Sequence, residues 1–196
     1  YVDLFRASSL QSLGKIYAAA VTQATASKLE EAAQFIRDNF PIIRPKVIVK
    51  GPTAAEFELD FEAPAHDVER WLDEIYDLPQ RIAERKKKKL VVVFDEFQEI
   101  AALGPPGTVE RGLRSKIQHH DRVAYVFMGS KRHLLDELFT DKSRPLYHIA
   151  KPIPLGKIPK EKLGDFIRSR FESSGMKISA ARTDRILEIT ECHSYY

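Results

Sequence analysis

The stretch LVVVFDEFQ, residues 90–98, places five consecutive apolar residues directly before two adjacent carboxylates. The apolar run is too short for a helix, and polar and apolar residues do not alternate within it. Most of its residues are β-branched, which favours a strand. These features predict a strand that is buried on both faces, as in a parallel sheet covered by helices. We therefore expect an α/β fold.

Two acids, Asp95 and Glu96, stand where this strand should end. In open α/β sheets, ligands bind at the carboxyl ends of the strands, so both acids face the expected site. Such a pair suits phosphoryl transfer, in which one carboxylate holds Mg²⁺ while the other orients or deprotonates the attacking water. The motif is short, however, and two solvated acids at the end of a strand explain it equally well.

The composition narrows the class of protein. A length of 196 residues allows one domain, or one domain and part of a second. The apolar content of 43% supports a packed core, and the net charge of +3 does not by itself indicate nucleic acid. One cysteine, Cys192, excludes an internal disulfide framework and fits a reducing compartment, so we expect a cytoplasmic protein. Apolar runs fall well short of the roughly 20 residues of a membrane span, and no membrane partner is expected.

Two helices are expected near the start of the chain. A short strand over residues 1–5 leads into the first helix, for which Ser8 and Gln11 have the spacing of a capping box. Ser27 repeats this signature at the start of the second helix, which Pro41 ends.

Residues 46–61 then change to strand character. A turn is expected at Gly51-Pro52. The second half of the segment alternates apolar and acidic residues, so one face of that strand should be exposed to solvent. We expect an antiparallel hairpin at the edge of the main sheet. Residues 65–86 are predicted to be helical, with a break at Pro79 and a second short helix capped by Asp77.

A basic run, RKKKK at residues 85–89, lies between this helix and the acidic strand. We interpret it as a solvated connection that also favours the dipole at the carboxyl end of the helix. A nucleic-acid-binding patch is the alternative, although no aromatic residues interleave with the basic ones.

A second short strand is predicted over residues 122–128. It ends in Gly129-Ser130, so a small polar residue takes the position that the acid pair has on the first strand. The alternative is a turn in which Ser130 is the N-cap of a helix over residues 134–139. Residues 153–158 are weakly strand-like, and two further helices are expected after residue 160.

The order of these elements is similar to that of a P-loop ATPase. Four motifs resemble, more narrowly, the archaeal-type ATPase domain family of the AAA+/STAND group: FDEFQEI (94–100), FMGS (127–130), RPLY (144–147) and CHSYY (192–196). The resemblance covers essentially the whole chain. It implies an α/β P-loop NTPase core over residues 1–158, with a parallel sheet flanked by helices and an edge hairpin, and the start of a helical lid over residues 159–196.

The resemblance also implies roles for individual residues. Asp95 would be the Walker B acid that coordinates Mg²⁺, and Glu96 the catalytic acid that positions water. Ser130 would be the sensor 1 residue that reads the γ-phosphate. Arg132 and Arg144 are candidate phosphate or arginine-finger residues, because arginine commonly stabilises a departing phosphoryl group. The implied cofactors are ATP and Mg²⁺, and the implied function is that of a switch or signalling ATPase.

One part of the family pattern is missing. The sequence contains no G-x-x-x-x-G-K-[ST], and its nearest counterpart, Gly14-Lys15, lies inside a helical stripe. The resemblance implies that the first strand and the P-loop precede residue 1. Most of the phosphate cradle would then be absent, so we expect this chain alone to leave a core strand unpaired and to bind ATP poorly.

Two other functions remain open at this point. The chain could be an interaction module that has lost its P-loop for good and serves as a scaffold. It could also belong to a nucleic-acid-associated ATPase similar to replication initiators, with a winged helix beyond Tyr196. A protein client or a second copy of the chain would be the partner of a switch ATPase.

Overall fold

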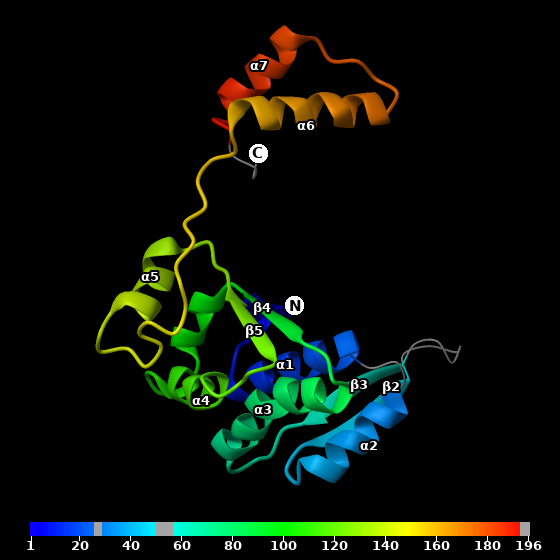
Figure 1. The fold of residues 1–196 in the computed structure, drawn as a ribbon, viewed down its shortest axis with the longest axis vertical. Coiled ribbons are helices and arrows are strands. Elements are labelled where there is room, and N and C mark those ends of the chain that lie inside the picture. The colour runs from blue at the N-terminus through cyan, green and yellow to red at the C-terminus, as the bar shows by residue number, and fades with distance from the viewer. Residues whose placement is uncertain (26–28, 50–56, 193–196) are drawn as a thin grey trace. The chain divides into compact units, whose positions relative to one another are not determined.

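The predicted strand over residues 90–94 is the central strand of the main sheet. The computed structural model describes residues 1–25, 29–49 and 57–192, and in this part of the chain β4 (Leu90–Asp95) lies between β1 (Val2–Asp3) and β5 (Val123–Phe127). Both neighbours run parallel to β4, and Figure 1 shows β5 beside it; the register aligns Asp3 with Asp95 and Phe94 with Phe127. The expected α/β fold with a parallel sheet is confirmed.

The aromatic core covers one face of this sheet. Phe94 is buried, and its ring stacks on Tyr17 of α1 (Leu10–Thr25), with ring centroids 5.3 Å apart. On the other face, the side chains of Val91 and Val126 are 64% and 42% exposed. The expectation of burial on both faces is therefore wrong for these strands. Residues alternate between the two faces of a strand, and α1 packs on the face that carries Phe94.

The N-cap of α1 lies one residue after the predicted Ser8. Ser9 rather than Ser8 caps the helix: the amide of Ser12 donates to Ser9 Oγ at 3.1 Å, and the amide of Ser9 donates to Ser12 Oγ at 2.9 Å. This is the reciprocal pattern of a capping box, with a serine hydroxyl in place of a glutamine. The predicted strand over residues 1–5 is also shorter, because a 3₁₀ turn at Leu4–Arg6 follows β1.

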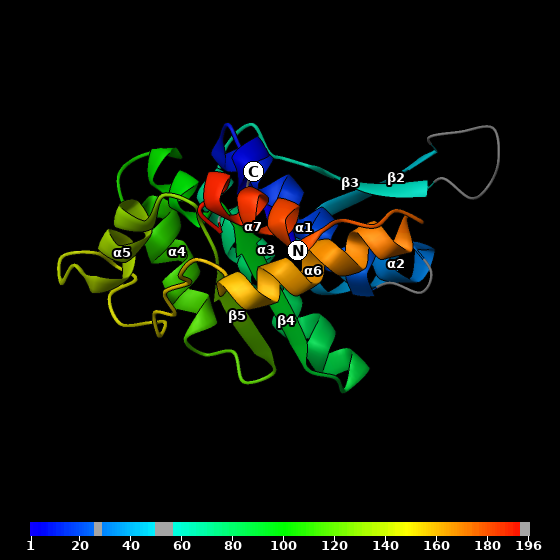
Figure 2. The ribbon, with the colours of Figure 1, turned by 90° about the horizontal axis from the view of Figure 1, so that it is seen from above.

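The predicted hairpin forms, but it does not join the main sheet. β2 (Arg44–Val49) and β3 (Phe57–Glu62) pair in antiparallel fashion as a separate two-stranded sheet (Figure 2). Leu59 and Phe61 of β3 are buried, and the hairpin packs on α1 and α2 (Leu29–Asn39). Because its apolar face is covered by helices, the hairpin needs no place at a sheet edge. The predicted turn at Gly51-Pro52 and the cap at Ser27 lie outside the described residues.

Helix α3 (Val68–Lys86) continues through Pro79 without the predicted break. Proline in a helix costs about 3 kcal/mol, since it removes one backbone hydrogen bond. The apolar face of α3, which includes Trp71, Ile75 and Ile82, is buried on both sides of Pro79. Packing of that face outweighs the local cost. The basic run at residues 85–89 begins in the last turn of α3, and its side chains are exposed, as predicted for a solvated connection.

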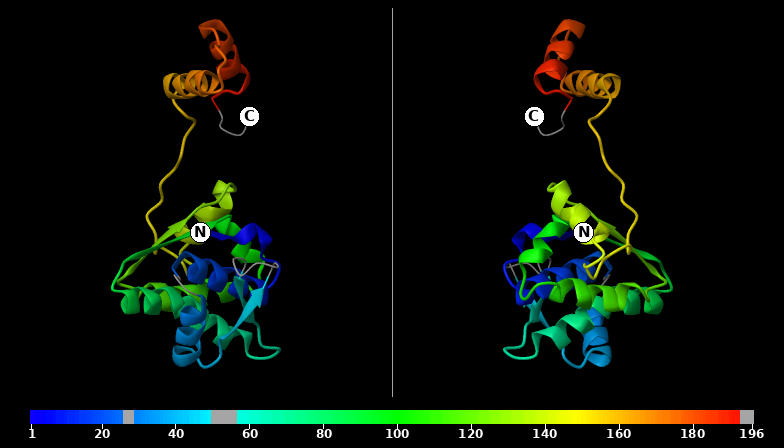
Figure 3. Two further views of the ribbon diagram at one scale, coloured as in Figure 1. Left: turned by 90° about the vertical axis from the view of Figure 1, so that its right-hand side faces the viewer. Right: turned by 90° about the vertical axis from the view of Figure 1, so that its left-hand side faces the viewer.

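The remaining elements follow the two long strands. A 3₁₀ helix and two α-helices complete the first compact unit, Tyr1–Pro152: η2 (Phe97–Ala102), α4 (Thr108–Ile117) and α5 (Arg132–Thr140). The second unit, Ile153–Tyr196, pairs α6 (Lys160–Ser173) with α7 (Ala180–Ile189) (Figure 3). Residues 153–158 form no strand, because Pro154 interrupts this largely exposed segment and Pro152 and Pro159 flank it. Within the described ranges, no helix has both the length and the apolar character needed to cross a bilayer.

Gly14 allows α1 and α3 to approach closely. A Cβ at this position would overlap the indole ring of Trp71. We predict that Gly14→Ala lowers the free energy of unfolding by about 1–3 kcal/mol, because overpacking exceeds the gain in helix propensity of about 1 kcal/mol. Chemical denaturation followed by circular dichroism measures the change. In a Trp71→Leu background, which provides room, Gly14→Ala should be neutral or stabilising, and an equal loss there would contradict the prediction.

A partly buried polar network joins α3 to β5. His120 makes hydrogen-bond contacts with Asp77 Oδ1 at 3.3 Å and with the Tyr125 hydroxyl at 2.7 Å. The hydrogen bond from His120 lowers the pKa of Asp77, and the nearby charges of Arg81 and Lys116 lower it further. Asp77 thus contributes stability that is present above its ordinary pKa and is lost as the pH falls through its lowered value in the folded protein.

We predict that Asp77→Asn lowers the free energy of unfolding at pH 7 by about 1 kcal/mol, since the carboxylate is 36% exposed. The difference from the unmodified protein should shrink as the pH falls below 3.8, the ordinary pKa of aspartate. Urea denaturation across this pH range measures it. Asp73→Asn is the matched control on the same helix, because the ion pair that Asp73 makes with Lys116 in the described residues is long, at 3.9 Å. If the difference in the free energy of unfolding between Asp77→Asn and the unmodified protein is the same at every pH, the prediction is wrong.

Candidate functional site

The acid pair stands at the turn where β4 passes into η2. Glu96 has φ 50° and ψ 43°, a left-handed conformation that is uncommon for residues other than glycine. The amide of Glu96 donates a hydrogen bond to Oδ1 of Asp95 at 3.0 Å. The turn separates the two carboxylates, so that each meets different partners.

Backbone pairing continues beyond the ends of β4 and β5. The amide of Met128 donates to the carbonyl of Phe94, and the amide of Phe97 donates to the carbonyl of Met128, both at 2.8 Å. These two bonds hold the residues after β5 against the acid turn. As a result, the Ser130 hydroxyl donates to Oε2 of Glu96 at 2.9 Å, with the Ser130 amide at 3.5 Å from the same oxygen.

Glu96 has a second donor on the same oxygen. Nε2 of Gln98 lies 2.5 Å from Oε2. The hydrogen bond from Gln98, followed by those from Ser130, lowers the pKa of Glu96, because all of them favour the ionised form. No hydrogen bond from the described part of the chain reaches Oε1. The site therefore offers an ionised carboxylate with one oxygen held and the other open to a water molecule.

Asp95 has a partner on β1's side of the sheet. The Tyr1 hydroxyl donates to Oδ2 of Asp95, and this carboxylate raises the pKa of Tyr1 to about 12. In nucleotide sites, Mg²⁺ takes one or two protein carboxylates and fills its other positions with phosphate oxygens and water. Asp95 fits the part of a single protein ligand, provided that the Tyr1 hydroxyl turns away from Oδ2. Among the described residues, no group of three or more His, Cys, Asp or Glu could hold a metal by itself.

The two predicted arginines lie in different surroundings. Arg132 is the first residue of α5, two positions after Ser130, and its exposed side chain contacts Asp136 at 3.4 Å. Arg144 lies in the loop after α5, where it pairs with Glu110 of α4 at 3.0 Å. The structure brings Asp95, Glu96 and Ser130 together, and neither arginine contacts these three side chains in the described residues.

The Glu110–Arg144 pair is largely removed from water. Glu110 is 1% exposed, and the side chain of Arg144 is 22% exposed. Burial raises the pKa of Glu110, while the charge of Arg144 acts to lower it. Neither carboxylate oxygen of Glu110 has a hydrogen bond of good geometry within the described ranges, so the attraction is mainly coulombic. In this arrangement Arg144 ties α4 to the loop after α5.

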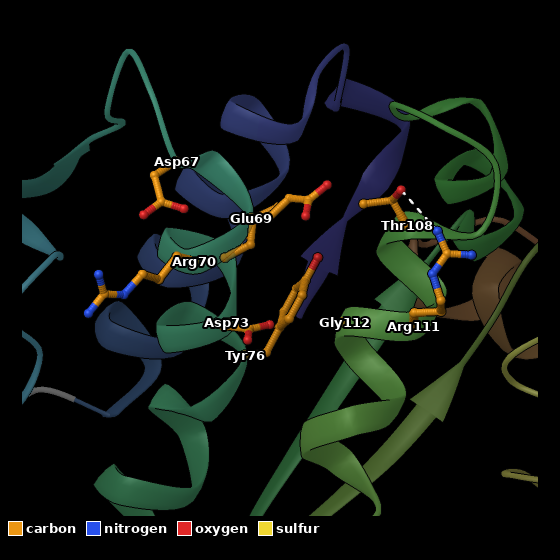
Figure 4. A pocket seen from close by; sticks show the side chains of 9 residues that line it. Asp67, Glu69, Arg70, Asp73, Tyr76, Thr108, Arg111 and Gly112 are labelled. Atoms are coloured by element: carbon orange, nitrogen blue, oxygen red, sulfur yellow. Dashed lines mark hydrogen bonds between the residues drawn. The ribbon is translucent and has the colours of Figure 1, made fainter.

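A separate pocket of about 380 Å³ opens between the beginnings of α3 and α4 (Figure 4). Acidic and basic side chains of α3 line it together with Arg111 of α4, and Arg111 Nη2 lies 3.4 Å from the Thr108 hydroxyl. The acid turn and Ser130 are not part of its lining. Its residue pattern in the sequence gave no signal of a pocket.

Sequence reasoning missed two contacts of the acid pair, those of Gln98 and Tyr1. Gln98 was part of the quoted motif, but no role was predicted for it; its place two residues after Glu96 was the available signal. For Tyr1, the sequence predicts a place in a strand and no contact with Asp95. The alternative in which Ser130 caps the next helix is wrong, because Lys131 is the N-cap of α5 and makes no side-chain cap. The Ser130 hydroxyl bonds to Glu96 instead.

The arginine environments give a prediction. Arg144→Ala leaves the Glu110 carboxylate buried without its partner, so we expect the free energy of unfolding to fall by about 2–3 kcal/mol. Arg132→Ala is the control, with an expected change of at most about 0.5 kcal/mol because its ion pair is exposed. Chemical denaturation compares the two variants. Replacing Glu110 and Arg144 together by leucine should restore most of the loss, and equal effects at Arg132 and Arg144 would contradict this account.

Comparison with known proteins places the fold. No model of a known protein family matches the chain, and no curated protein matches its sequence. The fold is similar to the solved structure of a Walker-type ATPase of Pyrococcus abyssi, with a TM-score of 0.54 and 15% sequence identity. The similarity covers 95% of this chain and 50% of the Pyrococcus abyssi chain, so this chain spans about half the length of that protein. The chain therefore has an α/β fold that resembles a Walker-type ATPase, with a three-stranded parallel sheet, flanking helices and a small hairpin in the described residues.

Proposed function

We propose that this chain is part of the ATP-binding, Mg²⁺-dependent ATP-hydrolysing domain of a AAA+/STAND-type switch or signalling ATPase, of the archaeal-type ATPase family. The observation that carries the proposal is the contact between Ser130 and Glu96 across the ends of two neighbouring parallel strands, next to Asp95. Ligands of open α/β sheets bind at such strand ends. The structural likeness to a Walker-type ATPase supports the same assignment.

Each residue of the acid site has a role in this proposal. Asp95 would hold Mg²⁺, which neutralises charge on the phosphates when it is bound. Glu96, ionised and held through Oε2, would accept a hydrogen bond from the attacking water at Oε1 and orient it. Ser130, which already donates to Glu96, would stand close to the γ-phosphate and report its presence.

Arg132 and Arg144 remain candidates for stabilising charge on the phosphoryl group, but they differ in how accessible they are. Arg132 is exposed and close in sequence to Ser130, so its guanidinium is available to a phosphate or to a neighbouring subunit. Arg144 would first have to leave Glu110. We therefore favour Arg132 over Arg144 as the residue that stabilises charge on the phosphoryl group.

The proposal extends to the rest of the protein. Residues 1–158 would form the ATPase core and residues 159–196 the start of a helical lid. Its partners would be ATP and a protein client or a second copy of the chain, with nucleic acid as a partner only through a domain outside this chain. A chain that lacks the P-loop should bind ATP poorly by itself, so the tests use the full-length protein.

Substitution of each acid tests the roles. In the full-length protein, Glu96→Gln should lower the turnover of ATP about 100-fold or more and preserve ATP binding, because only water orientation is lost. Asp95→Asn should lower turnover and also weaken the binding of Mg-ATP. Steady-state hydrolysis and calorimetric titration with Mg-ATP measure these effects. Asp38→Asn, on the exposed face of α2, is the control and should change neither.

Three results would contradict the proposal. Unchanged turnover in both acid variants would remove the catalytic assignment. Failure of the full-length protein to bind ATP would favour the scaffold alternative. Salt-dependent retardation of nucleic acid by residues 1–196 themselves would place the nucleic-acid contact within this chain.

A further inference from the structure

We propose that Gln98 is a positioning residue, which holds the Glu96 carboxylate against Ser130 and so determines which carboxylate oxygen is open to water. The consequence for catalysis rests on the proposed ATPase function, whereas the contact itself does not. Neither the family resemblance nor the structural comparison assigns a role to this glutamine.

Gln98 is a buried polar side chain on a rigid support. It is 3% exposed, although glutamine is usually found at the surface. Its neighbour Phe97 packs among Phe94, Phe127 and Phe139, with ring centroids 5.5, 4.4 and 5.7 Å away. This aromatic cluster anchors the first turn of η2, which carries Gln98. The glutamine thus approaches Glu96 from a fixed part of the core.

Gln98 and Ser130 converge on one oxygen of Glu96. The Gln98 amide nitrogen lies 2.5 Å and the Ser130 hydroxyl 2.9 Å from Oε2. Two donors from different strand ends restrict the rotation of the carboxylate, because a partial turn would break both hydrogen bonds. Oε1 then faces away from both. A carboxylate that orients water needs this kind of fixed geometry.

The orientation of the Gln98 amide follows from the chemistry of its partner. An ionised carboxylate only accepts hydrogen bonds, so the NH₂ end of the amide must face Glu96. Its Oε1 consequently points towards Gly129, where an added Cβ would overlap it. That oxygen has no hydrogen-bond partner in the described part of the chain. An unsatisfied buried carbonyl is costly, and such groups in native proteins call for a functional explanation.

The contact can be tested without any ATPase activity. A double-mutant cycle with Gln98→Met, Glu96→Ala and the pair together measures the coupling in the unfolding equilibrium of residues 1–196. Methionine retains the volume of glutamine and removes the donor, so it should fold. We expect coupling of about tenfold or more in the unfolding constant, as for one hydrogen bond to a charged group. Fluorescence of Trp71, the single tryptophan, follows unfolding of the core.

The positioning role is tested in the full-length protein. Gln98→Met should lower kcat for ATP about 10- to 100-fold and leave KM within about twofold, because the glutamine acts through Glu96 and does not touch the nucleotide. Gln80→Met is the matched control. Gln80 is also a buried glutamine, and it binds Asp121 and the Arg122 amide at 2.7 and 3.1 Å, away from the acid turn. It should lower stability without a specific loss of kcat.

The outcomes separate the two proposals. Additive effects in the cycle would overturn the contact, and a kcat equal to that of the Gln80→Met control would overturn the positioning role. Coupling in the cycle on residues 1–196, together with a full-length protein that hydrolyses no ATP, would establish the Gln98 contact and reject the proposed function.

Discussion

The hydrogen bonds that continue the β4–β5 pairing past the ends of both strands are the constraint on which the acid site depends. Parallel strands normally diverge into separate loops once their ladder ends. Here Met128 and Phe97 extend the ladder by one step, at 2.8 Å in each bond. That step brings a serine hydroxyl and a glutamate carboxylate from distant parts of the sequence within 2.9 Å. The aromatic residues around Phe97 keep the step rigid, so the polar contact rests on the core beneath it.

Local patterns in the sequence predicted the elements well, and the contacts between elements less well. The uniform apolar run at residues 90–94 can hardly be anything but a strand, and the positions of Asp95 and Ser130 at strand ends follow from it. Pro79 was misleading because burial along the whole of α3 outweighs a local penalty. The place of the hairpin depended on whether a helix covers its apolar face, and no local pattern encodes that.

Side-chain pairing was beyond prediction for a similar reason. The sequence marks Arg144 as a charge, but only the fold shows that Glu110 lies buried beside it. Glutamine is usually found at the surface, but the turn at Glu96 places Gln98 in the interior. The Glu110–Arg144 and Glu96–Ser130 pairs each join residues 34 positions apart, and a single sequence contains no record of which partners meet. The surroundings of a polar residue in the fold decide whether it stabilises the structure or belongs to the candidate site. The residue type alone does not reveal this.

The left-handed backbone of Glu96 bears on how this position can vary among sequences. Folding alone would favour glycine there, since glycine adopts a positive φ without steric conflict. A glutamate therefore reflects a trade-off, in which some stability is given up to keep a carboxylate at the tip of the turn. β-branched replacements would meet the greatest resistance, so the range of tolerated mutations at residue 96 should be narrow even before any chemistry is considered.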